Sequence, residues 1–208
     1  MDSVTASPLM GHPPTFSSPP AEALGPTQAP LLRAAAPWLA RHPRLPLPGR
    51  GQTLERWRHL AAIAAEDVCL AKLLEAHYDA QAILADLDAA MPPAGTLWGV
   101  WAAEGPDATL RYGEGRLHGS KPWCSGAASV SHALVTAQCG DARGLVAVAL
   151  DQPGIRIDGS GWQAVGMQRI ETARVDFDGS LATRVGPEGG YLARPGFWHG
   201  GAGIAACW

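Results

Sequence analysis

The 208-residue chain lacks the cysteine and hydrophobic patterns of several common protein classes. Its four cysteines, Cys69, Cys124, Cys139 and Cys207, form no Cys-x-x-Cys pair and no zinc-site spacing, so we expect reduced thiols and no metal centre. No uninterrupted apolar run reaches the roughly 18 residues of a transmembrane helix, and no basic segment precedes an apolar run at the N-terminus. The sequence therefore predicts a cytoplasmic protein without membrane association.

An excess of positive charge is also absent. Lysine and arginine number 16 against 19 acidic residues, for a net charge of −3 at pH 7, and we therefore expect no nucleic-acid partner. The sequence contains no Gly-x-Ser-x-Gly elbow, no Gly-x-x-x-x-Gly-Lys-[Ser/Thr] phosphate loop and no dinucleotide-binding glycine motif between a strand and a helix. These absences argue against hydrolases, nucleoside triphosphatases and nicotinamide-dependent dehydrogenases that depend on these motifs.

Proline is concentrated at the start of the chain, where residues 1–50 hold 11 of the 18 prolines. Proline removes a backbone donor and interrupts helices, so we expect a disordered tail over 1–50, with at most one short helix at 31–41. From residue 53 to 90 the apolar residues recur at helical spacing. Asp67, a residue typical of helix N-caps, divides this stretch into two helices of an N-terminal helical domain, residues 51–94.

After residue 95 the pattern changes to short apolar runs separated by Gly, Pro and Asp. This spacing predicts an antiparallel β-barrel or sandwich over residues 95–190. The fold class is therefore α+β, with an N-terminal helical domain followed by a middle β-domain. The expected strands lie near residues 97–103, 109–112, 116–118, 133–138, 145–150, 155–157, 173–177 and 183–185.

Trp123 and Ser125 are the most informative pair in the β-domain. They are two residues apart in a segment with strand character, which places both side chains on one face. An indole can stack on a planar ring while a neighbouring hydroxyl bonds to a ring heteroatom, an arrangement that suits an isoalloxazine. The other interpretation is a buried tryptophan beside a Ser-Gly turn.

Three stretches of the chain resemble the acyl-CoA dehydrogenases and their oxidase and monooxygenase relatives. Residues 119–127 are similar to the family's Gly-x-Lys-x-Trp-x-[Thr/Ser] strand, and 130–137 to the hydrophobic strand that follows it. Residues 162–167 and 173–179 resemble its Trp-x-x-x-Gly-Met and Val-x-Phe-Asp-Gly segments. Residues 74–83 are similar to its helical Glu-Gly-[His/Asn] segment, and all three stretches occur in the family's order.

The resemblance implies an FAD cofactor held on one side by the middle β-domain. Trp123 and Ser125 match the family residues at the flavin ring. Val100, Ala102 and Ala103 match the strand end whose backbone meets the flavin. The implied reaction is the α,β-dehydrogenation of an acyl thioester in fatty acid metabolism, with acyl-CoA or a related small molecule as the substrate.

Two further features, one match and one departure from the family pattern, bear on the substrate and the mechanism. Glu75 matches a glutamate near the far end of the acyl pocket, although a solvated helix face is the other interpretation. The family's Glu-Pro-Gly-x-Gly-Ser-Asp loop is shortened here to residues 104–108, without the Ser-Asp pair that helps to bind the thioester. This loss keeps open a flavin-dependent monooxygenase of the same fold.

Residues 191–208 resemble the start of the family's C-terminal helical domain, and we expect the chain to stop within its first turns. In the family that domain covers the flavin, supplies the carboxylate base and forms the interface of a homo-oligomer. We therefore assign no catalytic residue in this chain. A further alternative is an inactive truncated product that interacts with an intact relative.

Overall fold

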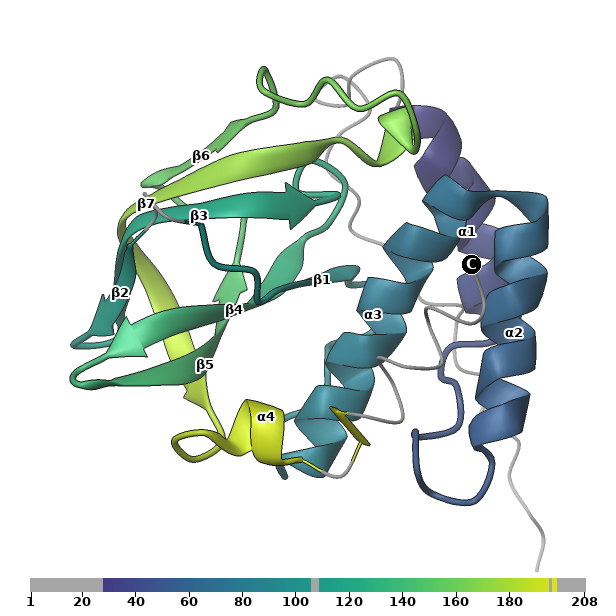
Figure 1. Ribbon diagram of the computed structural model, residues 1–208, viewed down its shortest axis with the longest axis horizontal. Helices are drawn as coiled ribbons and strands as arrows, with labels where there is room; N and C mark the ends of the chain where they lie inside the picture. Colours follow the sequence, from purple (N-terminus) through teal and green to yellow (C-terminus); the bar gives the residue numbers. More distant parts are fainter. Residues whose placement is uncertain (1–27, 106–108, 195, 198–208) are drawn as a thin grey trace, which may run out of the picture.

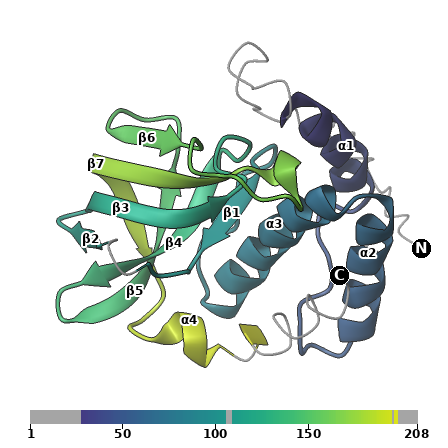
Figure 2. The same ribbon diagram turned by 45° about the horizontal axis from the view of Figure 1, so that its top comes forward.

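The computed structural model describes residues 28–105, 109–194 and 196–197. Three long helices lie beside a β-barrel (Figure 1). Helices α1 (Gln28–Arg41) and α2 (Thr53–Glu66) lie on the outer side of α3 (Val68–Asp86), and α3 packs against the barrel (Figure 2). The described part of the segment 1–50 thus contains α1, whose Leu31 and Trp38 are buried in the core. The rest of that segment lies outside the described residues.

The predicted division between the two central helices is confirmed at Asp67. Its backbone is extended, with φ −165° and ψ 116°, and its carboxylate accepts hydrogen bonds from the amides of Cys69 at 2.8 Å and Leu70 at 3.3 Å. These bonds satisfy two of the free amides at the start of α3. The carboxylate also forms an ion pair with Arg169, which attaches the start of α3 to the β-domain.

The β-domain is a five-stranded barrel with two additional strands, which confirms the predicted α+β class. Around the barrel, β2 pairs with β3, β3 with β7, β7 with β5, β5 with β4, and β4 with β2. Most pairings are antiparallel, but β4 runs parallel to both β1 and β2. The strands are β1 (Trp98–Trp101), β2 (Leu110–Gly113), β3 (Arg116–Ser125), β4 (His132–Cys139), β5 (Ala142–Ala149), β6 (Ile155–Asp158) and β7 (Thr172–Val185).

One hydrophobic core joins the barrel to the helices. Leu117, Val135 and Val175 are fully buried in the barrel and belong to the same cluster as Leu73 and Leu74 of α3. A shared core fixes the barrel relative to α3, because neither part can separate without exposing apolar surface. The barrel and α3 therefore hold the strand ends between them in a fixed position.

The chain leaves the barrel through β7 and enters the short helix α4 (Gly190–Ala193). The helical start expected at 191–208 falls mostly on residues 198–208, which lie outside the described residues. Arg194, at the end of α4, is buried and forms ion pairs with Asp79 at 3.1 Å and Asp86 at 3.5 Å. These contacts hold the last described segment against α3. Among the described helices, none is long and apolar enough to cross a membrane.

Candidate functional site

A β-bulge in β3 presents Trp123 on the outside of the barrel. Lys121 pairs with Val175 and Cys124 with Ala173, so Pro122 and Trp123 together oppose the single residue Arg174. Trp123 has φ 54°, in the left-handed region, and its exposed fraction is 56%. The indole therefore lies outside the core, unlike the buried tryptophan of the alternative interpretation.

Ser125 follows Trp123 on the same outer side of β3. Trp123 is exposed, Cys124 is completely buried and Ser125 is half-buried, which is the alternation of a strand with one face inside the barrel. The Ser125 hydroxyl lies 3.1 Å from the Thr172 hydroxyl on β7. A hydroxyl of this kind can still donate or accept one further hydrogen bond.

The end of β1 reaches the same region through Trp101. The buried Trp101 indole donates a hydrogen bond of 3.2 Å to the Ser125 carbonyl, which joins the ends of β1 and β3. Directly after β1, Ala102 is half-buried and Ala103 is exposed. Val100 is different, because its side chain packs against the second core cluster, around Trp98 and the C-terminal half of α3.

Lys121 is a member of this region that sequence reasoning did not single out. Its side chain is 1% exposed, and Nζ donates to Glu104 Oε1 at 2.7 Å, Thr136 Oγ1 at 2.8 Å and the Thr136 carbonyl at 2.9 Å. Burial lowers the pKa of Lys121, while the bond to Glu104 acts in the opposite direction. The available signal was the lysine of the Gly-x-Lys-x-Trp motif, but a lysine in a strand is usually solvated.

Glu75, the candidate substrate residue, lies in α3 and is only 7% exposed, so it is not on a solvated helix face. Lys72 lies one turn before it, with Nζ 3.1 Å from Glu75 Oε2. Burial raises the pKa of Glu75 and outweighs the opposing effect of Lys72. No contact within the described residues joins Glu75 to Trp123, so these two predicted site residues belong to separate environments.

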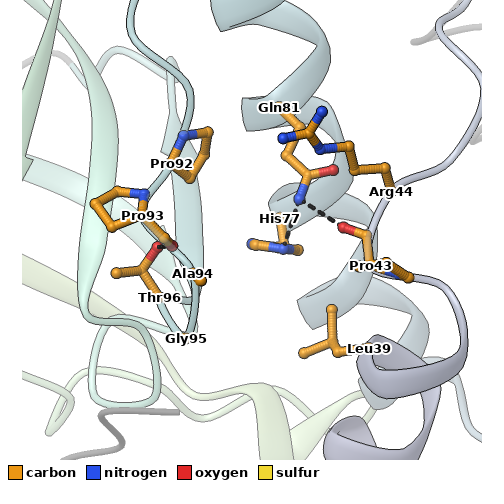
Figure 3. A pocket seen from close by; sticks show the side chains of 10 residues that line it. All are labelled: Leu39, Pro43, Arg44, His77, Gln81, Pro92, Pro93, Ala94, Gly95 and Thr96. Atoms are coloured by element: carbon orange, nitrogen blue, oxygen red, sulfur yellow. Dashed lines mark hydrogen bonds between the residues drawn. The ribbon is translucent and has the colours of Figure 1, made fainter. Parts of the chain in front are cut away.

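His77, two residues further along α3, is a buried structural residue. Its Nδ1 is 3.3 Å from the Trp98 amide nitrogen, and its Nε2 is 3.0 Å from the Gln81 side-chain nitrogen. Burial lowers the pKa of His77 to about 4, so the ring is neutral at pH 7. His77 and Gln81 line a cavity of about 180 Å³ between α3, the 92–96 loop and Pro43 (Figure 3).

A second cavity, of about 210 Å³, lies between the barrel and α4. Ala102, Thr136 and Arg143 line it on the barrel side, and Tyr191 and Leu192 on the α4 side. It thus borders the same β1 end that the family resemblance places against the flavin.

The sequence matches no protein-family model and no curated protein. Several solved structures have the same fold. FkbI, described as acting in biosynthesis of the methoxymalonyl extender unit of Fk520, matches with a TM-score of 0.66 and 19% identity over 89% of this chain and 60% of its own. Glutaryl-CoA dehydrogenase from Mycobacterium smegmatis matches with a TM-score of 0.57 and 14% identity over 89% of this chain and 51% of its own.

TdsC from Paenibacillus sp. A11-2, a dibenzothiophene monooxygenase solved with FMN and indole, matches with a TM-score of 0.53 and 22% identity over 64% of this chain. The chain spans between 39% and 60% of the length of these three proteins. It therefore has the helical and β portions of the acyl-CoA dehydrogenase fold, as its motifs predicted. This fold is shared by a CoA-ester dehydrogenase and a flavin monooxygenase.

Proposed function

We propose that this chain is the flavin-facing part of an oxidoreductase and that the isoalloxazine ring of FAD stacks on Trp123. One observation carries the proposal: a large aromatic side chain stands exposed on a bulge with a left-handed backbone, beside a hydroxyl on the same face. Strained backbone conformations cluster at binding sites, and an exposed indole beside a hydroxyl suits a planar ring with heteroatoms.

The residues present fit a flavin. If stacking covers the exposed half of the indole, roughly 140 Å² of apolar surface is removed from water, a gain of about 3 kcal/mol before the losses of association. Ser125 supplies a hydrogen-bonding group for the ring edge, and the backbone of Ala102 and Ala103 supplies others at the end of β1. A bound flavin would accept a hydride or electrons from the substrate.

For the reaction we propose α,β-dehydrogenation of an acyl thioester, in which this chain orients the flavin and a base lies elsewhere. Glu75 would set the polarity at the far end of the substrate pocket. Burial raises the pKa of Glu75, which favours its uncharged form and suits a pocket that admits an uncharged chain. The functional enzyme would be a soluble cytoplasmic homo-oligomer acting on a small molecule.

A second candidate is a flavin-dependent monooxygenase of the same fold. The specific observation in its favour is the placement of Glu104, the acidic residue at the start of the shortened loop. Its Oε1 atom accepts hydrogen bonds from Lys121 and from the Thr136 hydroxyl, both at 2.7 Å, so this carboxylate is committed to the protein rather than to a thioester. A monooxygenase also needs no base for an α-proton. An inactive partner of an intact relative is the third candidate.

The first experiment measures flavin binding by the full chain. We expect purified protein reconstituted with FAD to show a bound-flavin spectrum, and Trp123→Ala to lose it. Trp57→Ala is the matched control, because Trp57 is a half-buried tryptophan of α2 on the helical side. Equal binding by Trp123→Ala and the wild type would overturn the proposal, and stronger binding of FMN than of FAD would change the cofactor.

The second experiment separates the two reactions. Under anaerobic conditions, dehydrogenation predicts that an acyl-CoA bleaches the bound flavin directly. A monooxygenase predicts that only a separate flavin reductase with a nicotinamide donor bleaches it. Bleaching by neither would favour the inactive partner.

A further inference from the structure

The candidate flavin site is made of two segments that no direct strand pairing joins. One is the stretch that follows β1, residues 102–104, and the other is the bulge of β3, residues 121–125. In the sheet, β1 pairs with β4, whereas β3 pairs with β2 and β7. Because β4 also pairs with β2, the sheet connects the two segments only through two intervening strands, and a direct contact between them would fix their distance more closely.

We infer that the ion pair between Lys121 and Glu104 performs this task, with Lys121 as a positioning residue for the flavin. The inference rests on the proposed function. Lys121 lies two residues before Trp123, at the start of the bulge, and Glu104 directly follows Ala103. Their 2.7 Å contact therefore joins the two segments directly. The Trp101–Ser125 hydrogen bond is a second, uncharged connection between them.

The hydrogen bonds around Lys121 are complete. An ammonium group has three donors, and here they meet Glu104 Oε1, Thr136 Oγ1 and the Thr136 carbonyl. The Thr136 hydroxyl lies 2.7 Å from Glu104 Oε1 and 3.4 Å from the Ala102 carbonyl, so Thr136 of β4 contacts both partners of the ion pair and the segment that follows β1. A saturated buried network has one low-energy arrangement, which is the property that positioning requires.

The Lys121–Glu104 ion pair is partly buried, which distinguishes it from a mobile surface ion pair. The Lys121 side chain is 1% exposed and that of Glu104 is 33% exposed, so the lysine is fixed and the carboxylate is drawn to it. Removing the carboxylate leaves a buried ammonium group without a counter-charge, and an unpaired buried charge destabilises the folded state. Arg143 also approaches Glu104, at 3.5 Å, but its side chain is 58% exposed and contributes little.

The test compares Lys121→Met and Glu104→Gln with two controls in the full chain. Arg156→Met removes an exposed ion pair with Asp176 on the far side of β7. Val148→Ala truncates a buried side chain of β5 and lowers stability without touching the network. Glu104→Gln keeps the shape of the carboxylate, so it carries the test if Lys121→Met does not fold.

Amide hydrogen exchange measures how firmly residues 102–105 are held, and it needs no bound flavin. We expect at least tenfold faster exchange over residues 102–105 in Lys121→Met and Glu104→Gln, and unchanged exchange there in both controls. With FAD, we expect at least tenfold weaker binding and an altered visible spectrum, measured below the melting temperature of each variant.

Two results would overturn the inference. The first is unchanged exchange over residues 102–105 in both network variants. The second is a loss of flavin affinity no larger than that of Val148→Ala at an equal fall in melting temperature, which would show a stability effect alone. A wild-type chain that binds no flavin would instead refute the proposed function, and the exchange measurement would still decide the role of the ion pair.

Discussion

The backbone of Trp123 allows a sharp test of how β3 presents its indole. With φ 54°, Trp123 occupies a conformation that costs a residue with a Cβ atom roughly 1–2 kcal/mol and costs glycine almost nothing. We therefore compare Trp123→Gly with Trp123→Ala. Both variants lose the same indole, so the loss of its packing cancels in the comparison.

The expected difference follows from two opposing terms. Relief of the left-handed strain favours the glycine variant by roughly 1–2 kcal/mol, and the greater freedom of glycine in the unfolded chain disfavours it by about 0.5–1 kcal/mol. Trp123→Gly should therefore be more stable than Trp123→Ala by about 0.5–1 kcal/mol. For a chain of this size, that corresponds to about 1–4 °C in melting temperature.

The assay is urea unfolding of both variants, followed by far-ultraviolet circular dichroism, with a matched pair at Thr183. Thr183 is exposed in β7, opposes Ala147 in regular register and lies outside the left-handed region. There the order should be reversed, with the alanine variant more stable by about 0.5–1 kcal/mol. The same order at both positions would refute the strained bulge, and with it the physical argument for the exposed indole.

Three further predictions concern residues outside the bulge. His77 has a pKa of about 4 in the folded state, so the folded protein binds fewer protons than the unfolded protein below about pH 6.5. The free energy of unfolding should therefore fall by up to about 3 kcal/mol from pH 7 to pH 4. In urea unfolding, His77→Gln should reduce this pH dependence. Asp67→Ala should lose about 1–2 kcal/mol at pH 7, and the loss should shrink as the pH falls through the lowered pKa of Asp67, which hydrogen bonds from Arg169 and the helix amides hold down despite partial burial. Burial raises the pKa of the Cys124 thiol, so iodoacetamide should alkylate half-buried Cys139 before Cys124 in native protein, as read by peptide mass spectrometry; the reverse order would contradict the structure.

The sequence predicted the helices and the β-domain because their signals are local. The N-cap role of Asp67 and the two helices on either side of it could be read from residue type and apolar period. The single strand β7 was harder, since Gly179 looked like a break between runs at 173–177 and 183–185. In the structure Gly179 has φ 72°, and the chain continues through it without ending the strand. The parallel pairing of β4 depends on contacts between distant segments, which no local pattern carries.

The site was predictable only in part. The spacing of Trp123 and Ser125 predicted a shared face, and the structure places both on the outer side of β3. The role of Lys121 could not be read from the chain, because its acceptors on Glu104 and Thr136 come from segments distant in the sequence, the stretch after β1 and the strand β4. Glu75 was placed in the right helix, but its burial depends on how α2 packs against α3.

Lys121 is buried and Trp123 is exposed, the opposite of what is usual for a lysine and a tryptophan. The same bulge in β3 accounts for both. In a regular strand, residues 121 and 123 would share a face, so a buried Lys121 would bring the indole into the barrel. The extra residue at Pro122 turns Trp123 outward and places the small Cys124 inside instead. A chain optimised for stability alone would bury the indole and expose the ammonium group. Paired departures of this kind are expected where a surface is shaped for a ligand, and they support the proposal that the cofactor binds at this end of β3.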